Sequence, residues 1–363
     1  MKIKISEASK IVGIIAVLYG FLLSIALIGA AFKLFGAGIA QEIIHITSNA
    51  YVGLFIGILA TSLLQSSSAT TSMVVSMVAG DVLTVQNAIP IIMGSNIGTS
   101  VTNTLVSVGH IGRKQEFKLA FAASTMHDFF NIFAVLLLFP LQHFTGFLST
   151  FSEKLALGFQ NVGGLSFISP IKLITAPVSH WIVDLAGKEP IIILIISLAM
   201  LFSSLRLLVK LLKMLLLKRV ESFFSRHIFK TPLQGFFFGM VFTVMVQSSS
   251  ITTSIVIPLA AAGILTLYQI YPYTLGANIG TTITAILASL VSGAIEPVTV
   301  AFSHLLFNLS GIALIYPFKK IRHLPIDLAR ILAEKACQNR WVPLLYVLCL
   351  FFLIPLALIW ITR

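Results

Sequence analysis

An eight-residue block of amide and hydroxyl side chains occurs twice in this chain. Gln65-Ser-Ser-Ser-Ala-Thr-Thr-Ser72 returns as Gln247-Ser-Ser-Ser-Ile-Thr-Thr-Ser254, and the two copies differ at one position. Such side chains offer N–H and O–H donors to an oxyanion and oxygen ligands to a hard cation. We therefore predict a binding site at the start of each block, formed by Gln65, Ser66, Ser67, Ser68, Gln247, Ser248, Ser249 and Ser250.

A second polar motif is repeated at the same spacing. Gly94-Ser-Asn-Ile-Gly-Thr99 matches Gly276-Ala-Asn-Ile-Gly-Thr281. Glycines beside an asparagine allow a helix to break and its carbonyl oxygens to turn inward as ligands. We expect such breaks at Asn96 and Asn278, and we add both residues to the predicted substrate site.

One carboxylate lies in the middle of an apolar stretch. Asp128 is in residues 116–140, and Asn131 follows it on the same face of the expected helix. A carboxylate inside a bilayer is costly and usually lines an ion path. His127 and His304 also recur between the halves, and the sequence leaves their roles open.

The composition places these motifs in a membrane. Of the 363 residues, 57% are hydrophobic and 10% are charged, and the mean hydropathy is +1.01. The net charge of +12 does not indicate a nucleic-acid partner, because the basic residues lie between apolar runs, as they do in membrane proteins. Since a helix needs ~20 apolar residues to cross a bilayer, we predict seven spans, at 11–32, 84–109, 116–140, 189–211, 266–292, 297–317 and 341–361.

Two further apolar stretches are each interrupted by a polar block. In residues 49–80 and 231–263 the arms on either side of the block are shorter than a spanning helix. Short arms around a polar turn are typical of re-entrant hairpins, whose tips are buried in protein or line a cavity. The predicted fold class is therefore an all-α integral membrane protein, with about seven transmembrane helices and two re-entrant helical hairpins.

The order of these elements predicts two inverted repeats in one transport domain, 1–363. Three spans separate the hairpins, so the second half should cross the membrane in the opposite sense to the first. The distribution of Lys and Arg predicts that the N-terminus lies in the cytoplasm and the C-terminus outside. The membrane that we expect is the cell (inner) membrane. The expected segments are a first repeat (11–140), an outside interfacial segment (141–188), a second repeat (189–318) and an extra C-terminal span (341–361).

The paired QSSS blocks, the GSNIGTSVTNT run and the HD-x-x-N stretch resemble the type II sodium-dependent phosphate cotransporters and their bacterial relatives. The resemblance implies a sodium-coupled symporter that uses alternating access, with phosphate held between the two QSSS tips. The implied partners are phosphate, sodium and the lipid bilayer; no cofactor is expected beyond the transported sodium ions, and a homodimer is left open. The implied sodium ligands are Asp128, Asn131, Thr70, Thr71, Thr252, Thr253, Thr99, Thr281 and Asn308.

Other functions fit some of these residues. A transporter of another oxyanion, or one coupled to protons, would use the same donors. A channel can also contain inverted broken helices. Ser, His and Asp residues occur in intramembrane hydrolases too, but the G-x-S-x-G motif around a nucleophilic serine does not occur in this sequence. We therefore expect a secondary transporter and not an enzyme.

Overall fold

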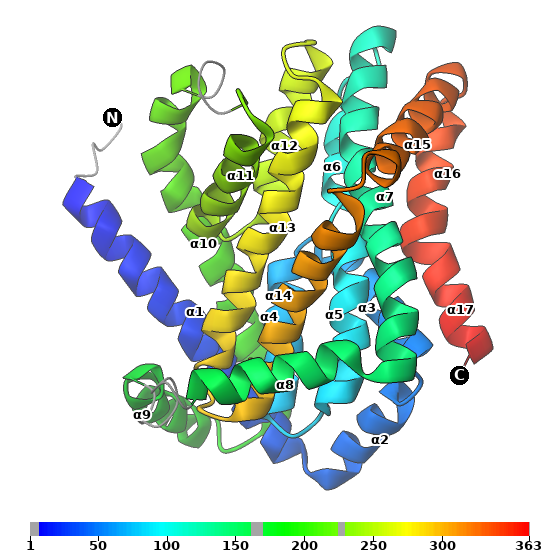
Figure 1. The fold of residues 1–363 in the computed structure, drawn as a ribbon. Helices are drawn as coiled ribbons and strands as arrows, with labels where there is room; N and C mark the ends of the chain where they lie inside the picture. The colour runs from blue at the N-terminus through cyan, green and yellow to red at the C-terminus, as the bar shows by residue number, and fades with distance from the viewer. Residues whose placement is uncertain (1–6, 161–169, 224–228, 363) are drawn as a thin grey trace.

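The computed structural model describes residues 7–160, 170–223 and 229–362, and within these ranges it contains helices and no strands. A chain in lipid must satisfy its backbone N–H and C=O groups internally, which an α-helix does within one segment. Figure 1 shows most of the helices running roughly alongside one another, with α8 lying across one end of the bundle. The predicted all-α membrane fold class is confirmed.

The helices fall into two halves, a connection and a C-terminal extension. In the first half they are α1 (Glu7–Phe35), α2 (Ala37–Thr47), α3 (Ala50–Leu64), α4 (Ser67–Ala79), α5 (Val85–Gly98), α6 (Val101–Val108) and α7 (Lys114–Thr145). The connection contains α8 (Phe147–Phe159) and α9 (Pro170–Leu185). The second half contains α10 (Pro190–Phe223), α11 (Pro232–Val246), α12 (Ser249–Ala261), α13 (Leu267–Ser289) and α14 (Ile295–Ile315). The extension contains α15 (Lys319–Gln338), α16 (Trp341–Leu348), a π-helical turn (Cys349–Leu353) and α17 (Ile354–Thr362).

Five helical segments in the described part of the chain are long and apolar enough to cross a membrane. They are Val12–Phe35, Lys114–Thr145, Pro190–Leu208, Ile295–Ile315 and Trp341–Thr362. These five correspond to five of the seven predicted spans. A sixth is reached if α2 and α3, which meet at a bend of 98°, together form one span.

The other two predicted spans differ from expectation. The span predicted at 84–109 is two helices, because α5 ends at Gly98 and α6 begins at Val101. The break predicted at Asn96 is thus present, but it lies three residues later, at Thr99 and Ser100. The span predicted at 266–292 is the single helix α13, which is long enough to cross a membrane but is not among the sufficiently apolar segments. The break predicted at Asn278 is therefore wrong, since α13 passes through it without interruption.

Glycines of the repeated motif allow two helices to pack closely in both halves. A Cβ on Gly276 would lie 1.9 Å from the main-chain oxygen of Phe236 in α11, and a Cβ on Gly94 would lie 1.9 Å from that of Leu54 in α3. Only glycine allows the helices to approach this closely. In the pairs α3–α5 and α11–α13, the glycines of the repeated motif thus bring two backbones together.

Each QSSS block forms the break between two short helices. α3 and α11 have 15 residues each, and α4 and α12 have 13 residues each. At both breaks the glutamine has a left-handed backbone, with φ 52° at Gln65 and 54° at Gln247. A left-handed residue ends a helix and turns the chain sharply. The predicted short arms around a polar turn are thus present, whereas their re-entrant placement in a bilayer stays a prediction.

The segment predicted to lie at the outer interface contains α8 and α9, and residues 161–169 lie outside the described part. α8 packs against α14 and crosses the end of the bundle (Figure 1). α7 is the most buried of the five membrane-capable segments, and it contacts α5, α6, α12, α13, α14 and α15. The helix that carries Asp128 is therefore the central one.

Candidate functional site

The two QSSS breaks meet inside the protein. The Ser68 hydroxyl donates a hydrogen bond to the main-chain oxygen of Gln247, at 3.2 Å, across 179 residues of sequence. Ser66 and Ser248 are the N-caps of α4 and α12, and their hydroxyls accept from the main-chain N–H groups of Ala69 and Ile251. The N-terminal ends of two helices, with their partial positive charge, are thus brought to one place.

The two glutamines at the breaks are bonded differently. Gln247 is buried, and its Oε1 accepts from the Thr284 hydroxyl at 2.8 Å while its Nε2 donates to the main-chain oxygen of Val244 at 2.6 Å. Gln65 is exposed. The second break is therefore tied to α13 through its glutamine.

The second break is also attached to the first half. The Ser250 hydroxyl donates to the main-chain oxygen of Thr99 at 3.3 Å, at the point where α5 and α6 separate. Asn103 of α6 donates from Nδ2 to the Thr253 hydroxyl at 2.7 Å and accepts from the Ser254 hydroxyl at 3.0 Å. The residues at and after the interruption between α5 and α6 thus form hydrogen bonds with α12.

Four buried polar residues form a chain of hydrogen bonds across the core. His127 Nε2 lies 2.7 Å from Asn278 Oδ1. Asn278 Nδ2 donates to Asn131 Oδ1 at 2.9 Å, and Asn131 Nδ2 donates to the main-chain oxygen of Asn96 at 2.7 Å. The asparagines of both repeated N-I-G-T motifs are therefore joined through Asn131 of α7, and His127 of the same helix bonds Asn278. The predicted residues Asn96, Asn131 and Asn278 lie together, and His127 lies with them.

Asp128 belongs to a different set of contacts on α7. Its side chain is fully buried, and its Oδ2 accepts from the Tyr346 hydroxyl of α16 at 2.6 Å. Its Oδ1 is buried without a hydrogen-bond partner in the described residues. The Ser100 and Thr104 hydroxyls lie beside the carboxylate, and each donates to a main-chain carbonyl of its own chain segment. Three side chains with available oxygen lone pairs therefore lie together.

The predicted threonine ligands and Asn308 all donate to a preceding turn of helix. Their acceptors are main-chain oxygens three or four residues earlier in the chain. In the threonines this bond uses the hydroxyl proton, and in Asn308 it uses an amide N–H, so the side-chain oxygens keep lone pairs available. The residues are Thr70, Thr71, Thr99, Thr252, Thr253, Thr281 and Asn308. Ser67 and Ser249 are buried in the first turns of α4 and α12.

Sequence reasoning missed three residues that the structure brings to these sets. Asn103 and Thr284 bond the second break, and Tyr346 bonds Asp128. A polar residue inside an apolar stretch is a usable signal for Asn103, because such residues seek partners. For Tyr346 the signal is weak, since a tyrosine near the start of a span also fits a place at the membrane interface.

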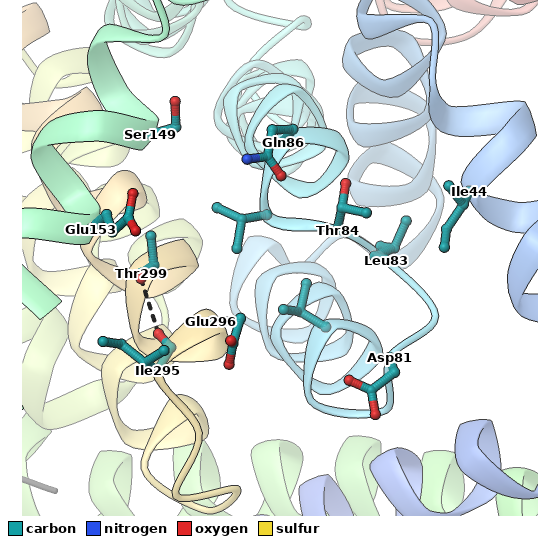
Figure 2. A pocket seen from close by; sticks show the side chains of 12 residues that line it. Ile44, Asp81, Leu83, Thr84, Gln86, Ser149, Glu153, Ile295, Glu296 and Thr299 are labelled. Carbon is teal, nitrogen blue, oxygen red and sulfur yellow. Dashed lines mark hydrogen bonds between the residues drawn. The ribbon is translucent and has the colours of Figure 1, made fainter. Parts of the chain in front are cut away.

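A cavity of about 420 Å³ lies away from these contacts. Figure 2 shows Glu153 and Thr299 on one side of it and Thr84 and Asp81 on the other. Glu296 supplies a third carboxylate to its wall. None of the predicted substrate or sodium ligands lines this cavity, so the repeated motifs converge elsewhere, at the meeting point of the two breaks.

Helices of membrane-spanning length and two converging polar breaks define a multi-pass helical membrane protein. The chain belongs to the Na+/Pi-cotransporter family, whose sequence profile it matches over residues 21–167 and 199–329. This is a family of transporters and not of enzymes, and the resemblance noted in the sequence is confirmed.

Three relatives illustrate the similarity. The chain is 37% identical to sodium-dependent phosphate transport protein 2A of Ovis aries, covering 95% of this chain and 66% of that protein. It is 36% identical to protein 2A of Rattus norvegicus, covering 93% and 65%, and 34% identical to protein 2B of Homo sapiens, covering 96% and 64%. The chain thus spans just under two thirds of the length of these relatives. No solved structure matches it.

Proposed function

We propose that this chain carries inorganic phosphate across the cell (inner) membrane together with sodium ions, as a symporter. The proposal is supported by membership of the Na+/Pi-cotransporter family and by relatives named as sodium-dependent phosphate transport proteins. The single observation that carries it is the contact between the two breaks, where Ser68 bonds the main chain of Gln247. That contact joins the two QSSS blocks and supports a shared site formed by both.

The breaks suit a phosphate anion. α4 and α12 both begin there, and the first N–H groups of a helix, with the dipole, favour negative charge. The hydroxyls of Ser66, Ser67, Ser248 and Ser249 add donors, and the two glutamines add amide N–H groups. The Ser68 and Ser250 hydroxyls already donate to main-chain oxygens and hold the breaks in place. Asn96 and Asn278, which are joined through Asn131, are further candidate substrate residues from the two halves.

In this proposal, bound sodium ions offset the negative charges of the phosphate and of Asp128. Asp128 keeps one oxygen without a partner, and the nearby Ser100 and Thr104 hydroxyls keep lone pairs. Sodium, like other hard cations, takes oxygen ligands. We therefore assign Asp128 to a sodium site. The threonines of the two breaks, with Asn131 and Asn308, are further candidate ligands, and the cations offset the charge of the phosphate.

The transport cycle requires a site that opens to each side in turn. We infer that the two halves are inverted, with the N-terminus in the cytoplasm, and that the helix pairs at the breaks enter from opposite faces. With Cys337 and Cys349 replaced, single cysteines at Ser66 and Ser248 should each react with an impermeant thiol reagent from one side only, and the two sides should differ. Free labelling of both from the same side contradicts the inverted arrangement.

The direct test is uptake of radioactive phosphate into vesicles reconstituted with the purified full chain. An inward sodium gradient should drive accumulation, and replacing sodium by choline should abolish it. Sulfate should not compete, whereas arsenate, which has the same shape and charge, should. Uptake driven by a proton gradient without sodium, or conductance with no coupling, refutes the proposed symport.

A further inference from the structure

The sodium site assigned to Asp128 contains a contact from outside the repeated halves. Tyr346 belongs to the C-terminal span, beyond residues 21–167 and 199–329 that match the family profile. Its hydroxyl donates to Asp128 Oδ2 at 2.6 Å, although 218 residues separate the two in sequence. We propose that Tyr346 is a positioning residue for this sodium site, an inference that rests on the proposed function.

The contact leaves the carboxylate with one occupied oxygen and one available oxygen. Oδ2 is held by the tyrosine, whereas Oδ1 is buried and without a partner in the described residues. A hydrogen bond to one oxygen fixes the rotation of the whole carboxylate, because both oxygens lie in one plane. Oδ1 therefore points in one fixed direction. In other proteins, hydrogen-bond partners of metal ligands orient the ligand atom in the same way.

Tyr346 is itself held by aromatic neighbours. Its ring centre lies 6.2 Å from Phe121, 6.5 Å from Phe129 and 6.2 Å from Phe351. The contacts with Phe121 and Phe351 are edge-on, which is a favourable geometry for aromatic pairs. The hydroxyl is therefore held in a fixed position relative to α7.

The C-terminal span has an irregularity directly after this tyrosine. α16 ends at Leu348, and the π-helical turn Cys349–Leu353 separates it from α17. A π-helical turn shifts the register of the side chains and often occurs at functional sites. Here α16 brings Tyr346 to Asp128 while α17 packs against α3, which ends at the first break. The C-terminal span thus contacts the proposed sodium site through α16 and an arm of the proposed phosphate site through α17.

A purely structural role makes a different prediction. If the hydroxyl only satisfied a buried carboxylate, its removal would lower stability and leave the sodium dependence of the protein unchanged. If it positions Oδ1, its removal should weaken sodium binding, and about tenfold is the lower end of the effect seen for partners of metal ligands. Phosphate affinity at saturating sodium should stay the same.

The test compares wild type with Tyr346→Phe, which keeps the ring and removes the hydroxyl. Tyr271→Phe is the matched control, because Tyr271 is also buried and its hydroxyl has no partner among the described residues. Two titrations are measured: phosphate uptake into vesicles against sodium, and the unfolding temperature of the purified protein against sodium, with choline chloride holding ionic strength constant.

We expect Tyr346→Phe to need about tenfold more sodium in both titrations and Tyr271→Phe to match wild type. In an Asp128→Ala background, loss of the tyrosine hydroxyl should add no further change. An unchanged sodium midpoint in Tyr346→Phe overturns the inference, as does an additive effect with Asp128→Ala. If wild type shows no sodium-driven uptake, the proposed function fails, and the unfolding titration still decides the role of Tyr346.

Discussion

Asn131 and Asn308 occupy equivalent positions in the two halves, yet their side chains are bonded differently. Asn131 accepts from Asn278 and donates to the main chain of Asn96. Asn308 donates only to the preceding turn, at His304, and its Oδ1 is buried without a partner in the described residues. The same residue type at the same position therefore links the two halves in one case and stays within its own helix in the other.

The breaks show the same kind of difference. Gln247 is buried and bonded to Thr284, whereas Gln65 is exposed. In the first half α5 ends at Gly98 and α6 begins at Val101, while the equivalent helix α13 of the second half continues without interruption. A sequence repeat thus establishes which groups each half can offer. The partners of those groups are set by the packing of one half against the other.

The largest effect should come from the asparagine that joins the halves. Asn278→Ala removes two buried hydrogen bonds and leaves His127 Nε2 and Asn131 Oδ1 without partners. We expect a loss of about 2–4 kcal/mol in the free energy of unfolding, since each unsatisfied buried group costs about 1–3 kcal/mol. Unfolding of the purified protein in denaturing detergent measures it.

Asn96→Ala is the matched substitution in the other half. Among the described residues, the Asn96 side chain bonds only the main-chain oxygen of Ile92 in its own helix. Its link to Asn131 uses the main chain, which the substitution keeps. Its cost should therefore be about 1 kcal/mol, the typical net value of one hydrogen bond. Equal losses for the two variants would mean that the difference between the halves does not affect stability.

Asp128 has no counterpart in the second half, where Leu305 stands in its place. Asp128→Asn keeps the shape and removes the charge, so it should weaken sodium activation of uptake by about 1–3 kcal/mol, the cost of losing a charged hydrogen-bonding partner. Phosphate affinity at saturating sodium should change little. Leu305→Ala is the control and should leave sodium activation unchanged; unchanged activation in Asp128→Asn removes Asp128 from the ion path.

Local patterns predicted the features that depend on local physics. The breaks at Gln65 and Gln247 follow from a polar block between arms that are too short to span, and α3, α4, α11 and α12 have those short lengths. Five spans follow from the length of apolar runs alone. These features need only the residues of one segment and its solvent, so the sequence contains what is required.

Long-range contacts were beyond such patterns. Thr99 and Ser100 separate α5 from α6, and Ser250 of the other half bonds the main-chain oxygen of Thr99 there. Tyr346 reaches Asp128 across 218 residues. Neither partner is visible from its own segment, because the position of one helix against another is set by the packing of the whole bundle.

The two glutamines test whether the breaks share one site. Gln65→Ala and Gln247→Ala should each impair transport, and in a double-mutant cycle of sodium-dependent phosphate binding they should couple by about 1 kcal/mol, as residues that share a partner do. Strict additivity would mean that the breaks bind phosphate independently. Gln338, which is exposed, is a suitable control. Gln142 is not, because its Oε1 accepts from the Leu148 N–H at 2.7 Å at the start of α8.

The smallest effect separates two serines at equivalent positions, Ser72 and Ser254. The Ser254 hydroxyl donates to Asn103 Oδ1 at 3.0 Å and to the main-chain oxygen of Ser250 at 2.5 Å, so Ser254→Ala should cost about 1 kcal/mol of unfolding free energy. The Ser72 hydroxyl is fully buried without a partner in the described residues. Ser72→Ala should therefore be neutral or slightly stabilising, because it removes a polar group that gains nothing from burial. Both variants delete one oxygen from the same place in the repeat, so their difference measures what the hydrogen bonds of the Ser254 hydroxyl contribute. If Ser72→Ala destabilises the protein as much as Ser254→Ala does, Ser72 has a partner of its own, and the two halves are more alike than their hydrogen bonds indicate.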